Sequence, residues 1–242
     1  MELKVLGSSS RGNCYILENE NEALIIECGV RMKDIKKALN FNVSKVKGCI
    51  VSHEHGDHAA SLSDVLTCGI PVYALQEVFN KRNVKHGTRI AIRENRGCLL
   101  GNFKVFSFPA HHDVPCVGFH ISHPECGNIF FLTDSSSCDY IFPTVDHIMI
   151  EANYKASTLS KAIDEGRTQA QQMGRLFEHH MELQDCIDVI NTMNTDSLQD
   201  ILLMHLSDNN SDERLFLQEV QRQTGKPVRI ANPGLVIDIA RF

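Results

Sequence analysis

The chain has 242 residues, of which 43% are hydrophobic and 22% charged, and its formal net charge is −6 with the histidines neutral. These values are typical of a globular protein with its own core. The acidic balance argues against a protein that coats nucleic acid through a broad basic face, but it does not exclude a nuclease, because bound cations would add local positive charge.

The remaining bulk features concern location and domain number. No basic start followed by an apolar run resembles a signal peptide, and no apolar run is long enough to cross a bilayer. The nine cysteines are odd in number and have no CxxC spacing, which favours reduced thiols. We therefore expect a cytoplasmic protein with no membrane partner. No repeat or Pro/Gly-rich linker divides the chain, so residues 1–242 are expected to form a single domain, of unknown oligomeric state.

The first half of the chain alternates short apolar strands with helices. Up to the first histidine cluster, the pattern predicts strands over Leu3–Leu6, Cys14–Glu18, Ala23–Glu27 and Gly48–Ser52 and a helix over Met32–Leu39. Beyond the cluster, it predicts helices over Ser61–Leu66 and Gln76–Asn80 and strands over Val72–Ala74, Arg89–Ile92, Lys104–Phe108 and Val117–Ile121.

The second half repeats this alternation. Strands are predicted over Ile129–Leu132, His147–Ile150, Asp200–Met204, Pro227–Ile230 and Leu235–Ile239, and helices over Gly166–Glu178, Leu183–Ile190 and Asp212–Gln223. Two rounds of strands, each followed by helices, predict an α/β fold in which two sheets pack together with helices outside, a four-layer αββα sandwich.

The strongest chemical signal is the segment His53-Glu54-His55-Gly56-Asp57-His58, which directly follows the predicted strand Gly48–Ser52. In an extended backbone His53 and His55 point the same way, because side chains alternate with period two. We expect Gly56 to let the chain bend sharply and turn Asp57 and His58 toward the same point. Imidazole and carboxylate ligands suit Zn²⁺, and also Mn and Fe. The segment therefore predicts a metal site at the carboxyl end of a strand.

This segment resembles the HxHxDH signature of the metallo-β-lactamase superfamily. Other pieces follow in the order of that superfamily: His111-His112-Asp113, Asp134 after the strand Ile129–Leu132, and His205 after Met204. The resemblance implies a first metal bound by His53, His55 and His112, a second bound by Asp57, His58 and His205, and Asp134 bridging the two. His112 is preferred to His111 because the similar motif in this branch of the superfamily has the ligand immediately before an Asp. The alternatives are that His112 only orients its neighbour, and that Asp134 only caps a turn before its three serines.

Finer motifs resemble the YycJ-type branch, on the phosphodiesterase side of the superfamily with RNase Z. They are Gly-Ser-Ser-Ser-Arg-Gly-Asn-Cys near the start, Glu151-Ala152-Asn153-Tyr154, His180-Met181 and His205-Leu206-Ser207-Asp208-Asn209-Asn210. The likeness implies that His180 lies near the metals as a proton donor or phosphate contact, although Glu182 departs from the Ser common there. A polar histidine near a helix end is the alternative for His180. Glu151 either supports a metal ligand or is a plain strand-end carboxylate.

The expected function is therefore that of a dinuclear metal-dependent hydrolase, a phosphodiesterase or nuclease that cleaves DNA, RNA or small phosphodiesters through a metal-bridging hydroxide. Two divalent ions are implied, with Zn as the first expectation and Mn or Fe as alternatives. Asp57, Asp134 and His180 are the expected catalytic residues. One rival is a glyoxalase- or lactonase-like hydrolase of a small ester, thioester or lactone, against which the late His180 speaks. A redox or metal-free scaffold is the other, against which the retained His55 and the full ligand set speak.

Overall fold

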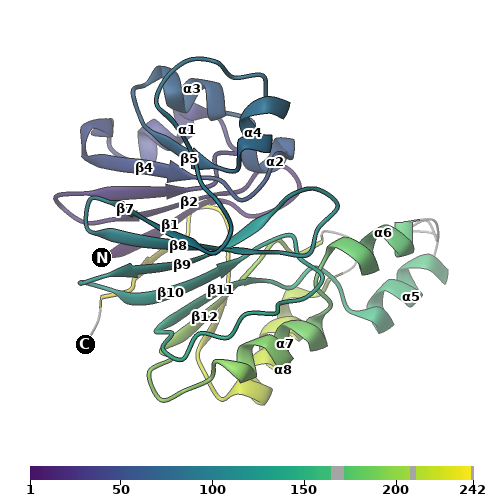
Figure 1. Cartoon of the computed structure of the whole chain (residues 1–242). Helices are drawn as coiled ribbons and strands as arrows, with labels where there is room; N and C mark the ends of the chain where they lie inside the picture. Colours follow the sequence, from purple (N-terminus) through teal and green to yellow (C-terminus); the bar gives the residue numbers. More distant parts are fainter. Residues whose placement is uncertain (165–171, 208–210, 241–242) are drawn as a thin grey trace. The chain divides into compact units, whose positions relative to one another are not determined.

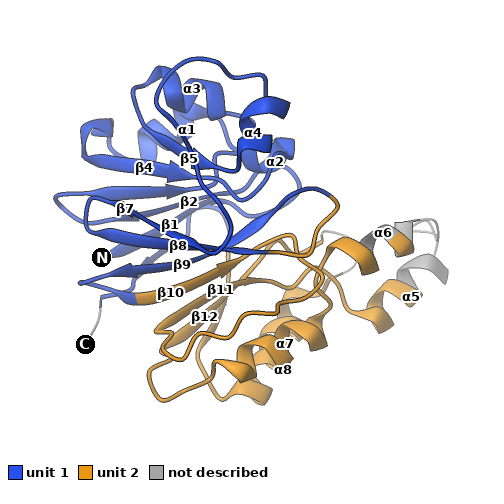
Figure 2. Cartoon of the chain, viewed as in Figure 1, with its two compact units in different colours: residues 1–109, 114–127, 232–242 blue, residues 110–113, 128–231 orange. Residues whose placement is uncertain are grey.

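The computed structural model describes residues 1–164, 172–207 and 211–240. It divides into two compact units (Figures 1 and 2). Unit 1 contains residues 1–109, 114–127 and 232–242, and unit 2 contains residues 110–113 and 128–231. Each unit is a set of paired strands with helices packed on it, and the expectation of a single domain stays a prediction.

The strands form two seven-stranded sheets. The first has the order β14-β1-β2-β3-β4-β5-β6, and its members are β1 (Glu2–Gly7), β2 (Cys14–Glu18), β3 (Ala23–Ile26), β4 (Val46–Ile50), β5 (Val72–Ala74), β6 (Arg89–Ala91) and β14 (Val236–Asp238). The second has the order β13-β12-β11-β10-β9-β8-β7, and its members are β7 (Arg96–Leu100), β8 (Phe103–Pro109), β9 (Val117–His123), β10 (Gly127–Leu132), β11 (His147–Glu151), β12 (Asp200–Met204) and β13 (Val228–Ile230).

The helices lie between these strands in sequence. Unit 1 carries α1 (Met32–Ala38), the 3-10 helix η1 (Val43–Lys45), α2 (Gly56–Ala59), α3 (Leu62–Thr67) and α4 (Gln76–Lys81). Unit 2 carries α5 (Ala156–Asp164), α6 (Gln172–His179), α7 (Leu183–Thr192) and α8 (Glu213–Thr224), of which α7 and α8 pack side by side (Figure 1). Among the described residues, no helix combines the length and apolar character needed to cross a membrane.

Four elements were not predicted from the sequence, namely η1, α2, β7 and α5, and one predicted helix extends outside the described residues. Strand β7 was not predicted, because its residues alternate weakly and most are exposed or half-buried. Helix α5 was also not predicted, since it begins Ala-Ser-Thr-Leu-Ser and only Leu159 among these five residues is buried. The helix expected over Gly166–Glu178 is present from Gln172, and residues 165–171 lie outside the described part of the chain.

Parallel strands in each unit end at residues of chemical interest. In the first sheet β3, β4 and β5 pair in parallel, so their carboxyl ends lie at one edge of that sheet. In the second sheet the same holds for β10, β11 and β12. Three of the residues that follow these ends have positive φ without being glycine: Glu27 at 63°, Asp134 at 46° and His205 at 51°. Such backbone strain is retained where the surrounding structure fixes it, often at functional sites.

Candidate metal centre

The four residues of the histidine segment that have metal-ligand side chains come together at the end of β4. His53 and His58 are fully buried, whereas His55 and Asp57 are half-buried. The ring centroid of His53 lies 4.7 Å from that of His55 and 4.2 Å from that of His58, and Asp57 Oδ2 lies 3.3 Å from His58 Nε2. This arrangement gathers three imidazoles and one carboxylate, as the spacing predicted.

The way in which the chain turns here differs from the expectation. Gly56 is not among the residues with positive φ, and a Cβ built on it would meet nothing within 4 Å. The turn arises because His55 is extended, with φ −61° and ψ 152°, and α2 begins at the next residue. The helix itself therefore turns Asp57 and His58 inward, and the predicted need for glycine flexibility was wrong.

Two loops of unit 1 hold helix α2 in place through backbone hydrogen bonds. The backbone N–H of Asn13 donates to Asp57 O at 2.7 Å, and that of Cys28 donates to His58 O at 2.8 Å. The Asn13 side-chain nitrogen also lies 3.0 Å from His58 Nε2. A Cβ on Gly29 would stand 1.6 Å from Asp57 O, so only glycine permits this close approach. The loops that carry Asn13 and Cys28 thus support the histidine segment.

Glu27 is a buried acid beneath the same segment. Its side chain is fully buried, its Oε1 accepts a hydrogen bond from the Ser52 N–H at 3.1 Å, and its Oε2 lies 3.6 Å from His58 Nδ1. Ser52 Oγ in turn lies 2.9 Å from His53 Nδ1. Sequence reasoning missed Glu27, although a single acid at the end of the apolar run Ala23–Ile26 was the available signal.

In unit 2, His112 faces Asp134, whereas its neighbour His111 does not. His112 Nε2 lies 3.8 Å from Asp134 Oδ2, while exposed His111 pairs with Asp139 at 2.6 Å. His112 Nδ1 lies 3.0 Å from the carbonyl oxygen of His179, which accepts a hydrogen bond from the Nδ1–H. Burial lowers the pKa of His112 and outweighs the opposing charges of Asp134 and Asp113. The neutral imidazole, with Nε2 as the unprotonated nitrogen, is the form a metal requires.

Glu151 organises two other histidines of unit 2, His180 and His205. Its fully buried carboxylate accepts hydrogen bonds through Oε1 from His180 Nδ1 at 2.7 Å and from His205 Nδ1 at 2.9 Å. Its Oε2 accepts from the N–H of Ser135, the residue after Asp134, at 3.1 Å. Burial raises the pKa of Glu151, but His180 and His205 outweigh burial and hold it below its usual value. One ionised carboxylate therefore orients two imidazoles and the turn that carries Asp134.

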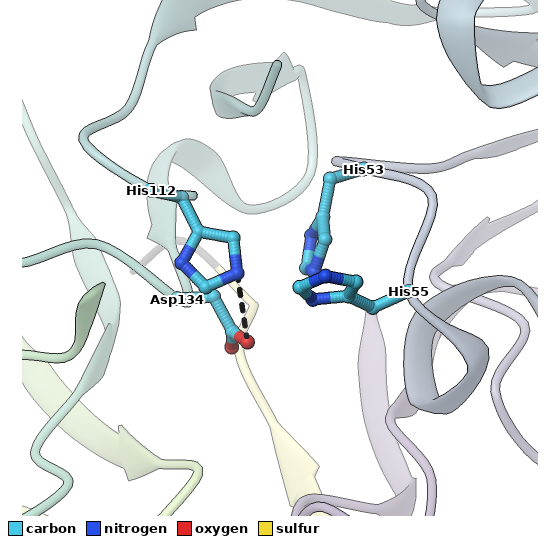
Figure 3. A group of neighbouring side chains, drawn as sticks. All are labelled: His53, His55, His112 and Asp134. Atoms are coloured by element: carbon cyan, nitrogen blue, oxygen red, sulfur yellow. Dashed lines mark ion pairs between the residues drawn. The ribbon is translucent and has the colours of Figure 1, made fainter. Parts of the chain in front are cut away.

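Three groups of side chains in the described residues are close enough to hold a metal ion, each with its ligand atoms within 4.8 Å of one another. They are His53, His55, His112 and Asp134 (Figure 3); Asp57, His58, Asp134 and His205; and Asp134, Glu151, His180 and His205. The structure therefore brings all seven predicted ligands into these groups, with Asp134 shared by all three. Nitrogen and carboxylate donors at these separations fit divalent metal ions.

Other residues of the quoted motifs have different positions. Glu182 is the N-cap of α7, where its side chain accepts from the Gln184 N–H. Asp208, Asn209 and Asn210 lie outside the described residues. His123 and His147, which belong to none of the ligand groups, pair with Glu22 at 3.1 Å and Asp200 at 2.9 Å.

Two sheets covered by helices, with His/Asp groups able to bind metal at strand ends, define a metallohydrolase-type α/β sandwich. The sequence profile of the metallo-β-lactamase superfamily matches residues 9–130. This chain belongs to the metallo-β-lactamase superfamily, which confirms the predicted αββα class.

Relatives and solved structures agree with this assignment. The chain is 24% identical to the exodeoxyribonuclease YycJ of Bacillus anthracis over 243 residues, covering 93% of this chain and 90% of that protein. It is 24% identical to the exodeoxyribonuclease WalJ of Streptococcus pneumoniae, covering 87% and 83%. The metallo-β-lactamase fold protein YhfI of Bacillus subtilis has the same fold, with a TM-score of 0.77, 19% identity and coverage of 98% and 99%. Human short-form tRNase Z matches with a TM-score of 0.64, 18% identity and coverage of 99% of each chain.

Proposed function

We propose that this protein is a dinuclear metal-dependent phosphodiesterase that acts on nucleic acid. One observation carries the proposal: Asp134 belongs both to the ligand group with His53, His55 and His112 and to the group with Asp57, His58 and His205. A further histidine, His180, lies close to Asp134 and is not needed to complete either of these groups. The naming of two full-length relatives as exodeoxyribonucleases supports a phosphodiester substrate.

The ligand sets follow from the groups. His53, His55 and His112 would hold one metal, Asp57, His58 and His205 the other, and Asp134 would bridge them. Two divalent metals bound there would acidify a water molecule and polarise the phosphate, and Zn is expected first, with Mn and Fe as alternatives. Asp57 and Asp134 would offset part of the cationic charge and help to orient the attacking water. Because this ligand set runs from residue 53 to residue 205, we infer that residues 1–242 act as one domain.

His180 is proposed as the proton donor to the leaving oxygen. Burial lowers its pKa, but the charge and hydrogen bond of Glu151 outweigh burial and raise it above the ordinary histidine value. The bond from Nδ1 to Glu151 Oε1 leaves Nε2 as the second proton-bearing nitrogen of the imidazolium. Glu151 is a positioning residue, since it acts through His180 and His205.

The test pairs metal analysis with hydrolysis of three substrates: bis(p-nitrophenyl) phosphate, a thioester and a lactone. We expect about two metals per chain and cleavage of the phosphodiester alone. Turnover of only the thioester or lactone would be compatible with the proposed metal site but would contradict the assignment as a phosphodiesterase. Failure to bind metal after reconstitution would overturn the ligand assignment. We also propose a cytoplasmic location, supported by the nine cysteines of the chain, an odd number without CxxC spacing.

A further inference from the structure

A groove in unit 1 lies apart from the ligand side chains. It has a volume of about 730 Å³ and runs along α1, β1 and the start of β14. Four cationic side chains line it, and Asp34 is the one acid among its lining residues; the cations are Lys4, Arg11, Arg31 and Lys37. A local cationic excess stands out in a chain whose formal net charge is −6.

The cations of the groove differ in how strongly they are already engaged. Lys4 forms an ion pair with buried Glu18 and donates to the Ala38 carbonyl at 3.1 Å, so its charge is largely committed. Arg31 is 83% exposed, and only its Nε is directed to Asp34, at 2.9 Å. Lys37 is exposed on the next turn of α1. Arg31 and Lys37 are therefore the cations best placed to meet an anionic ligand.

The groove also offers apolar surface beside these charges. Leu235 and Val236 line its β14 side, and Val236 is 53% exposed. A single nucleic-acid strand has both complementary features, an anionic backbone and unpaired bases that pack on apolar groups or on an arginine plane. A duplex hides its base faces and offers only the first of these features.

The groove is connected to the metal-ligand segment through the backbone. Gly29 lines the groove, and its Cα abuts the carbonyl of Asp57, where a Cβ would stand 1.6 Å away. Arg11 lines the groove from the loop whose Asn13 contacts His58. A ligand in the groove would thus be separated from the segment His53–His58 by the backbone around Gly29.

We propose that this groove binds the single-stranded nucleic acid that continues beyond the phosphate being cleaved. The inference rests on the proposed function and narrows its substrate class from any phosphodiester to a polymeric strand. Arg31 and Lys37 would contact backbone phosphates, and Leu235 and Val236 would pack on a base. Small diesters would not reach the groove and would not depend on it.

The experiment compares the wild type, the double variant Arg31→Ala/Lys37→Ala and a matched control, Lys33→Ala/Lys85→Ala. Lys33 is exposed on the same helix and Lys85 is exposed elsewhere in unit 1, and neither lines the groove. Binding of a dye-labelled, phosphorothioate-linked single strand of roughly 4–16 nucleotides is measured against salt, with a duplex of equal length alongside. Hydrolysis of bis(p-nitrophenyl) phosphate is measured on the same samples.

We expect the groove variant to bind the strand about 10-fold more weakly and to show a salt slope shallower by roughly 1.4, the value for two lost phosphate contacts on a single strand. Its kcat/KM on the small diester should stay at the wild-type value, and the control should match the wild type in both assays. Three outcomes would each contradict strand binding in the groove: equal binding by the groove and control variants, tighter binding of the duplex than of the single strand, or no strand binding by the wild type. Failure of the proposed function would appear separately, as absence of small-diester cleavage by the wild type.

Discussion

Glu151 and His180 are joined by a hydrogen bond of 2.7 Å between Oε1 and Nδ1, and the same oxygen lies 2.9 Å from His205 Nδ1. A proposed proton donor and a proposed metal ligand thus depend on one buried carboxylate atom. Because an ionised carboxylate only accepts hydrogen bonds, both histidines carry a proton on Nδ1 and present Nε2 away from Glu151. The two roles can be separated by mutating each partner in turn.

His180→Ala should slow cleavage of a diester with a poor leaving group by about 10²–10⁴-fold, because a positioned acid no longer protonates the leaving oxygen. Cleavage of bis(p-nitrophenyl) phosphate should change far less, since p-nitrophenolate leaves without protonation. Metal content should stay at the wild-type value. Steady-state kinetics on both substrates, with exposed His86→Ala as the control, checks this prediction. An equal loss on both substrates would rule out His180 as the acid.

Glu151→Gln should weaken metal binding by about 10–100-fold, because the amide is uncharged and replaces one of the two accepting oxygens with an NH2 donor, so it cannot accept from both the histidines and the Ser135 N–H. The variant should also lose the leaving-group selectivity that the His180→Ala experiment reveals. Competition with a chromogenic chelator measures the affinity. Wild-type metal affinity in Glu151→Gln would contradict the positioning role.

Asp134→Ala should lower the metal content below the roughly two ions per chain expected for the wild type and abolish diester cleavage, because both ligand groups lose their shared carboxylate. Elemental analysis of the purified variant, with circular dichroism to verify folding, checks this. Asp139→Ala is a suitable control, since Asp139 pairs only with exposed His111 among the contacts described and lies on the same loop. A folded Asp134→Ala protein with full metal content would refute the bridging assignment.

Gly29→Ala should destabilise the protein by about 3 kcal/mol, near the upper end of common point-mutant effects, because the added methyl group collides with the Asp57 backbone. Gly56→Ala should cost less than about 1 kcal/mol or raise stability slightly, since its Cβ meets open space at a helix start. Urea unfolding of both variants measures the difference. Similar free energies of unfolding would show that the Gly29 contact relaxes easily.

Glu18 gives a pH-dependent prediction away from the metal centre. Burial raises its pKa, but ion pairs with Lys4 and Lys45 outweigh burial and lower it. Glu18 therefore contributes stability above its unfolded pKa of about 4.3, and this contribution is lost as pH falls through the lower folded value. Glu18→Gln should cost about 1–3 kcal/mol at pH 7 and flatten the acid side of the stability curve. Exposed Glu20→Gln, which should change neither, is the control.

The sequence by itself determined the local chemistry of this protein. His53, His55, Asp57 and His58 are contiguous, so strand alternation and a turn were enough to predict that their side chains gather. Strands such as Cys14–Glu18 and Asp200–Met204 were predicted at the residues where they occur, because their apolar runs end in polar residues. His112, Asp134 and His205 followed from their order along the chain and a family resemblance, without any geometric argument.

Only the tertiary structure decided which isolated polar residues support that chemistry. Glu27 is a single acid at a strand end that nothing in the neighbouring sequence distinguishes from a surface carboxylate, and for Glu151 the sequence left two alternatives open, support of a metal ligand and a plain strand-end carboxylate. Their importance comes from partners far along the chain: Ser52 and His58 for Glu27, His180 and His205 for Glu151. Such pairings depend on which parallel strands become neighbours in a sheet, and that is fixed by packing of the whole core rather than by local periodicity.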